Sequence, residues 1–143
     1  DGCRSKVTAL LTLDTSVAVP LLVTSHSDHE RVHRWWSGRA VSLAGHASIE
    51  TYSVLTRLPG QSRLTGEDAA RLIANRFPLS LPLTEETQQG IPQFFADIGI
   101  AGGAVYDGLV ALAALEHGAV LATRDARAAP TYERVGARVE LLV

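Results

Sequence analysis

The sequence has little cysteine and little lysine: Cys3 and Lys6 are the only examples in 143 residues. One cysteine excludes an internal disulfide and is typical of a reducing compartment, so we predict a cytoplasmic protein. Because lysine is so scarce, nearly all positive charge is carried by arginine. The planar guanidinium of arginine can bind phosphate or carboxylate through two hydrogen bonds.

Long apolar runs are also missing, because Asp, Pro or Arg interrupts each run before it reaches membrane-spanning length. No signal peptide is recognisable, and no association with a membrane is expected. The formal net charge of −2 argues against a broad, sequence-independent nucleic-acid binder. It does not exclude a nuclease, since bound metal would neutralise carboxylates.

The length and the hydrophobic content of 46% fit one globular domain. We place this domain at residues 7–143, because the first strand pattern begins at Val7. The polar residues 1–6 are expected to be a tail or an expression remnant.

Apolar strand patterns alternate with helical patterns, which indicates an α/β protein with a mainly parallel sheet. Thr65 and Thr84 are predicted to cap helices, and Gly90 and Pro92 are expected to make one helix irregular. The predicted strands span residues 7–13, 41–44, 79–83, 119–123 and 138–143. The predicted helices span residues 14–22, 28–36, 48–58, 65–77, 102–118 and 128–135. One further helix is predicted to start at residue 84.

Four acidic residues lie where a globular protein would rather place apolar side chains. Asp14 and Asp125 each end an apolar strand pattern, Glu50 lies within HASIETYSVLTRL, and Asp107 lies within GGAVYDGLVALAALEHG. Carboxylates are rarely buried without a partner, and these runs contain too few basic residues to pair with all four. A divalent cation such as Mg²⁺ or Mn²⁺ would relieve the conflict.

The positions of the four acids predict that they meet. Ligands of parallel sheets bind beyond the carboxyl ends of the strands, where Asp14 and Asp125 fall, and the helices that carry Glu50 and Asp107 could cover that edge. Two bare carboxylates about 4 Å apart repel by roughly 4 kcal/mol at an effective dielectric near 20. A bound cation would remove this repulsion, activate a water and polarise a phosphoryl group, which suits phosphodiester hydrolysis.

Each acid also has an ordinary explanation. Asp14 could cap the following helix, Glu50 could face solvent, and Asp125 could shape a turn. Asp107 is harder to explain in this way, because its helical neighbours are apolar. The occurrence of all four at one predicted edge is what favours a functional centre.

In their order along the chain, the segments LDTS, SIETYSVLTRL, GGAVYDGLVALAA and LATRDARAAPTYERVG resemble a PIN domain, and more specifically the VapC toxins of bacterial toxin–antitoxin pairs. The resemblance covers nearly the whole chain from about Val7. It implies a three-layer α/β/α fold with a mainly parallel sheet of about five strands. It also implies an endoribonuclease that depends on Mg²⁺ or Mn²⁺ and cuts structured RNA such as tRNA, a homodimer, and inhibition by a cognate antitoxin.

The resemblance further assigns roles to individual residues. Catalysis and metal binding are expected from Asp14, Glu50, Asp107 and Asp125, with Ser16 and Thr123 as supporting hydroxyls.

Other side chains support weaker hypotheses. Arg124 and Arg127 flank Asp125 and could contact phosphate, or could simply be solvated. Trp35 and Trp36 are expected to pack in the core or an interface rather than to stack on bases. The five histidines form no metal-binding pattern and are expected at the surface.

Three other functions remain open on the sequence alone: a PIN nuclease for RNA maturation or decay without an antitoxin, a Mg²⁺-binding signalling receiver, and a PIN domain that only binds a partner. A receiver would need a lysine late in the chain, whereas Lys6 precedes the first predicted strand. A phosphatase is disfavoured because Asp14 is not followed by a second Asp two residues on.

Overall fold

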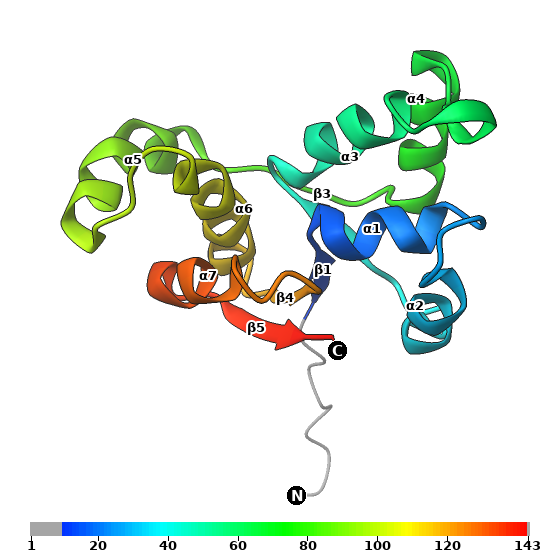
Figure 1. Cartoon of the computed structure of the whole chain (residues 1–143). Helices are drawn as coiled ribbons and strands as arrows, with labels where there is room; N and C mark the ends of the chain where they lie inside the picture. Colours follow the sequence, from blue (N-terminus) through cyan, green and yellow to red (C-terminus); the bar gives the residue numbers. More distant parts are fainter. Residues whose placement is uncertain (1–9, 143) are drawn as a thin grey trace, which may run out of the picture.

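In a computed structural model, residues 10–142 are described, and they form an α/β domain around a five-stranded sheet (Figure 1). The predicted tail at residues 1–6 and the start of the first predicted strand lie outside the described residues. All neighbouring strands are parallel, in the order β3-β2-β1-β4-β5. The strands are β1 (Leu11–Leu13), β2 (Ser42–Ala44), β3 (Ser80–Leu81), β4 (Val120–Thr123) and β5 (Arg138–Leu141).

Helices cover both faces of this sheet, with α1 to α4 on one side and α5 to α7 on the other (Figure 1). The predicted three-layer α/β/α architecture with a parallel sheet is therefore confirmed. The helices are α1 (Thr15–Leu22), α2 (His29–Trp36), α3 (Ala47–Thr56), α4 (Gly66–Arg76), α5 (Glu85–Ile98), α6 (Ala104–Glu116) and α7 (Ala129–Val135), with a short 3₁₀ helix, η1, at Gly60–Ser62.

The central strands are buried on both sides, which explains why they read as apolar runs in the sequence. Leu13 of β1 and Leu121 of β4 are fully buried. Thr12 is also fully buried, but its hydroxyl donates to the carbonyl oxygen of Ser42 at 3.1 Å. This bond satisfies a polar group that would otherwise be costly in the core.

The predicted caps are confirmed at two helices. The side-chain oxygen of Thr65 accepts a hydrogen bond from the backbone N–H of Asp68, and that of Thr84 accepts one from the N–H of Thr87. The irregularity expected from Gly90 and Pro92 does not interrupt α5, which runs through both. A proline inside a helix removes its own N–H donor, and α5 continues past Pro92 despite that loss.

The strand order creates a crevice between β1 and β4. The chain leaves β1 toward one face and reaches β4 from the other, so these neighbouring strands form a topological switch point. Their register pairs Leu13 with Ala122, which brings Asp14 and Thr123 to the same edge. The fold thus opens a site where the sequence places its acids.

Candidate active site

The structure brings all four predicted acids together at the carboxyl edge of the sheet. Asp14 follows β1, Asp125 follows β4, Glu50 lies in α3, and Asp107 lies in the first turn of α6. They surround a small cavity of about 80 Å³, lined by Asp14, Thr15, Ser16, Glu50, Asp107, Val110, Asp125 and Tyr132.

Asp14 is the most buried of the four, with only 4% of its surface exposed. Its Oδ1 accepts a hydrogen bond from Ser16 Oγ at 2.5 Å, and its Oδ2 accepts from Thr123 Oγ1 at 2.5 Å and from the Tyr132 hydroxyl at 2.8 Å. Although Asp14 occupies the N-cap position of α1, its side chain makes no capping hydrogen bond. The carboxylate is instead held in place by three hydroxyl donors.

The two predicted supporting hydroxyls also fix the chain that follows β4. Thr123 Oγ1 accepts the backbone N–H of Asp125 at 3.0 Å, and Ser16 Oγ accepts the backbone N–H of Arg124 at 2.8 Å. One small network therefore positions Asp14 and the backbone of Asp125.

Asp125 shapes the turn that leads into α7. Its Oδ1 accepts the backbone N–H groups of Arg127 at 2.9 Å and Ala128 at 3.3 Å. The turn role considered for this residue is therefore present, but it coexists with a place in the acidic cavity.

The two arginines beside Asp125 differ in their surroundings. Arg124 forms an ion pair with Asp28 and donates to the carbonyl oxygen of Ser16 at 3.2 Å, so a phosphate contact would require its guanidinium to leave these partners. Arg127 is 97% exposed, with its Nε 3.9 Å from Asp125 Oδ1. Phosphate binding by either arginine stays a prediction.

Glu50 and Asp107 are held less completely than Asp14. Burial raises the pKa of Glu50; His46 opposes this shift, while the negative charges of Asp107 and Asp14 add to it. The pKa of Asp107 is likewise raised, first by burial and then by Asp125 and Asp14. The negative charges of neighbouring acids therefore act on both Glu50 and Asp107.

Glu50 Oε1 is a buried oxygen that has no hydrogen-bond partner among the described residues. The imidazole of His46 lies beside it, with Nε2 3.7 Å from this oxygen, which is too far for a hydrogen bond. A buried acceptor without a donor is costly unless something else binds it. Among the features of the site, this oxygen is therefore the strongest indication of a bound ligand.

Tyr132 is a site residue that the sequence reasoning missed. Its side chain is only 2% exposed, and its pKa is raised by burial and by the Asp14 carboxylate to which it donates. The phenol therefore keeps its proton and acts as a donor. The available signal was a tyrosine on the apolar side of the helix that follows Asp125, but the chain positions of Asp14 and Tyr132 do not reveal their contact.

The donor set fits a hard divalent cation that retains several waters. All four groups are carboxylates, which Mg²⁺ and Mn²⁺ prefer, and one oxygen has no hydrogen-bond partner among the residues described. Within residues 10–142, no three His, Cys, Asp or Glu side chains are gathered closely enough to hold an ion by themselves. Mg²⁺ commonly binds through one or two carboxylates, so a complete protein cage is not required.

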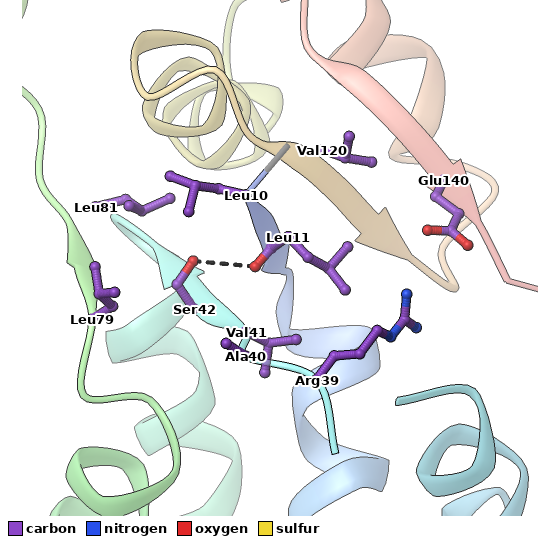
Figure 2. Close-up of a pocket in the computed structure, with 10 residues that line it drawn as sticks. All are labelled: Leu10, Leu11, Arg39, Ala40, Val41, Ser42, Leu79, Leu81, Val120 and Glu140. Atoms are coloured by element: carbon purple, nitrogen blue, oxygen red, sulfur yellow. Dashed lines mark hydrogen bonds between the residues drawn. The ribbon is translucent and has the colours of Figure 1, made fainter. Parts of the chain in front are cut away.

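A larger cavity of about 560 Å³ lies at the opposite end of the sheet, near the amino ends of the strands (Figure 2). It is mainly apolar, with Arg39 and Glu140 as its charged lining residues, and it adjoins Leu10, the first described residue. Figure 2 shows the hydrogen bond from Ser42 Oγ to the carbonyl oxygen of Leu11, which lies beside this cavity. None of the four acids lines it.

None of the helices formed by residues 10–142 has the length and apolar character needed to cross a membrane. The predicted cytoplasmic location stays a prediction.

Solved structures share this fold. FitAB bound to an IR36 DNA fragment aligns with a TM-score of 0.65 and 22% identity, covering 92% of this chain and 94% of that chain. VapBC2 from Rickettsia felis, bound to a DNA fragment from its promoter, aligns with a TM-score of 0.65 and 11% identity, covering 94% of this chain and 99% of that chain. At these identities the likeness shows the fold alone.

Sequence comparisons are more specific. The PIN domain family model matches residues 11–134. Ribonuclease VapC27 of Mycobacterium tuberculosis is 57% identical over 129 residues, which are 90% of this chain and 94% of the relative. Ribonuclease VapC40 of the same organism is 42% identical over 130 residues, which are 90% of this chain and 96% of the relative. The chain therefore belongs to the PIN domain family and, within it, to the VapC group.

Proposed function

We propose that this protein is an endoribonuclease that depends on a divalent cation and acts as the toxin of a toxin–antitoxin pair. The observation that carries the proposal is the convergence of four carboxylates on one cavity, where Glu50 Oε1 has no donor within residues 10–142. The related ribonucleases VapC27 and VapC40 support RNA as the substrate. The fold similarity to FitAB and VapBC2 supports an antitoxin partner.

Asp14, Glu50, Asp107 and Asp125 would hold the cation, one or two of them directly and the others through its bound waters. When bound, the cation supplies an activated water and neutralises charge on the phosphodiester. The chain's own contribution is orientation: three hydroxyls fix Asp14, and two backbone N–H groups fix Asp125. Without a cation, the raised pKa values of Glu50 and Asp107 mean that their carboxyls hold protons more readily than free side chains.

RNA cleavage by the purified protein tests this proposal. We expect Mg²⁺ or Mn²⁺ to support cleavage and EDTA to abolish it. Asp14→Asn or Asp107→Asn should lower the rate of cleavage by about 100-fold or more, because the charge stabilisation from a metal is worth several kcal/mol. Asp97→Asn is the matched control, since Asp97 is exposed on α5 and does not line the acidic cavity. Cleavage that persists in both cavity variants would refute the assignment of the centre.

Calorimetry with Mn²⁺ gives a second readout that does not depend on activity. Asp107→Asn is expected to weaken Mn²⁺ binding, and Asp97→Asn to leave it unchanged. Equal binding by both variants and the parent protein would place the cation elsewhere.

We further propose structured RNA such as tRNA as the substrate class and a homodimer as the active form. Comparing total tRNA with an unstructured RNA of equal length, and measuring mass in solution, tests these points. The toxin role predicts that expression arrests growth, that Asp107→Asn does not, and that co-expression of a neighbouring antitoxin gene restores growth. Normal growth without a partner would favour a nuclease for RNA maturation or decay.

A further inference from the structure

Two aromatic rings stack at the margin of the acidic cavity. The rings of His46 and Tyr106 have centroids 5.2 Å apart and an interplanar angle of 24°. Each ring is next to a cavity acid: His46 lies one helical turn before Glu50, and Tyr106 immediately precedes Asp107. The stack is therefore part of the surroundings of the proposed catalytic centre.

The backbone brings these rings together through a close approach of β2 to α6. Gly45 follows β2 with φ +44°, a conformation that favours glycine, and a Cβ at this position would lie 3.2 Å from the Cβ of Ala113. The tight turn at Gly45 places the next residue, His46, beside α6 and against Tyr106. The contact thus follows from the fold.

Tyr106 remains 53% exposed, and it is the one aromatic residue among the large hydrophobic side chains that residues 10–142 expose. Neither Tyr106 nor His46 belongs to the hydrophobic core, whereas Trp35 and Trp36 pack against it. An exposed ring that is already oriented by a second ring can accept a third at little cost in conformational freedom.

We propose that the His46–Tyr106 stack binds an unpaired base of the RNA substrate and so places the adjoining phosphodiester at the acidic cavity. This inference rests on the proposed ribonuclease function. The net charge of −2 provides little general attraction for a polyanion, and the cavity acids repel phosphate. Base stacking needs no charge, and an aromatic side chain contributes enough binding energy to compensate.

The test compares Tyr106→Ala with Tyr106→Phe, which keeps the ring. For a single-stranded oligoribonucleotide substrate, we expect Tyr106→Ala to raise KM by about 5- to 100-fold with little change in kcat, from the usual value of one stacked base. Tyr106→Phe is expected to behave like the parent protein. Leu115→Ala, at the other end of the same helix, is the control for removal of an exposed apolar side chain.

Fluorescence provides a second readout that does not require cleavage. An oligoribonucleotide containing 2-aminopurine is expected to be quenched on binding to Asp14→Asn protein, and the quenching should be lost when Tyr106→Ala is added. An unchanged KM and unchanged quenching in Tyr106→Ala would overturn the inference. Weaker inhibition by the antitoxin with normal RNA binding would also overturn it, because the rings would then serve a protein contact.

The two proposals fail in different ways. If the parent protein cuts no RNA, the ribonuclease function fails, whereas the quenching measurement still judges the stacking site. If cleavage is normal and the ring variants have no effect, only the stacking site fails.

Discussion

Asp14 and Asp125 follow strands, and the protein itself satisfies oxygens of both: hydroxyls bind Asp14, and backbone N–H groups bind Asp125. Glu50 and Asp107 sit on helices, and burial raises the pKa of each. Glu50 in addition keeps a buried oxygen that no donor reaches in the part of the chain that the structure describes. At the scale of the residue, the site thus consists of two oriented carboxylates and two poorly stabilised ones. A bound cation would therefore stabilise Glu50 and Asp107 most.

Tyr132→Phe tests the orientation of Asp14. The substitution removes the donor at 2.8 Å from Asp14 Oδ2 but keeps the buried ring. We expect the free energy of unfolding to fall by about 1.5–3 kcal/mol, the usual value of a hydrogen bond to a charged group, and RNA cleavage to slow. Urea denaturation measures the first effect and single-turnover cleavage the second.

Tyr106→Phe is the matched control for this substitution. The Tyr106 side chain is half-exposed and its hydroxyl makes no hydrogen bond with residues 10–142, so loss of the hydroxyl should change stability by less than about 0.5 kcal/mol. If Tyr132→Phe were equally silent, the bond to Asp14 would not be an important part of the site.

The four acids could be predicted from the sequence because each one breaks an apolar pattern. Tyr132 could not be predicted, since its contact with Asp14 joins residues 118 positions apart and depends on how α7 packs. The role of His46 could not be predicted either, because the predicted helix begins at residue 48 and the histidines are expected at the surface. Its contact with Glu50 and its stacking on Tyr106 depend on the turn at Gly45.

At the scale of the element, the predicted order of strands and helices is confirmed by the structure, because strand and helix periodicities are local properties. The spatial order β3-β2-β1-β4-β5 is not local. It follows from which edge of the sheet each crossover helix reaches, and that choice depends on packing across the whole chain. The sequence could therefore place acids at strand ends, whereas the neighbourhood of β1 and β4 required the structure.

The contact between α5 and α6 leads to a test at this scale. A Cβ at Gly108 of α6 would lie 2.7 Å from Cζ of Phe95, a ring of α5 that is only 4% exposed and cannot easily move away. We expect Gly108→Ala to destabilise the protein by about 1–3 kcal/mol through overpacking, although alanine favours helix formation. Because Asp107 is the adjacent residue, cleavage should also decrease.

Gly90→Ala provides the control, because a Cβ at this position of α5 would meet no atom within 4 Å. There only the helix propensity changes, and stability should rise by about 0.5–1 kcal/mol. Thermal unfolding of both variants distinguishes the two effects. A stabilising Gly108→Ala would mean that α5 is free to shift against α6.

At the scale of the whole molecule, the fold places carboxylates that repel one another at one edge of its sheet. The carboxyl ends of β1 and β4 are adjacent, so the acids that follow them must share a small cavity with the acids of α3 and α6. The rest of the molecule contributes a buried apolar core that contains no comparable conflict among the described residues. Stability at this edge should therefore depend on pH and on divalent cations.

Asp107→Asn tests this dependence through the sign of a pH effect. The pKa of Asp107 in the folded protein is raised above its ordinary value of 3.8, so the folded state binds this proton more tightly than the unfolded state. The stability that this proton contributes is therefore present below the ordinary pKa and is lost as the pH rises through the raised pKa of the folded state. Asparagine does not titrate, so the variant does not lose stability in this way. In EDTA, we expect the variant to gain stability relative to the parent protein as the pH rises from about 4 to about 8, measured by urea denaturation. Adding Mn²⁺ should stabilise the parent protein more than the variant, because a cation that binds the folded state through Asp107 shifts the equilibrium toward folding. A variant that is no more stable than the parent at high pH, and gains as much from Mn²⁺, would show that Asp107 neither bears this cost nor binds the cation.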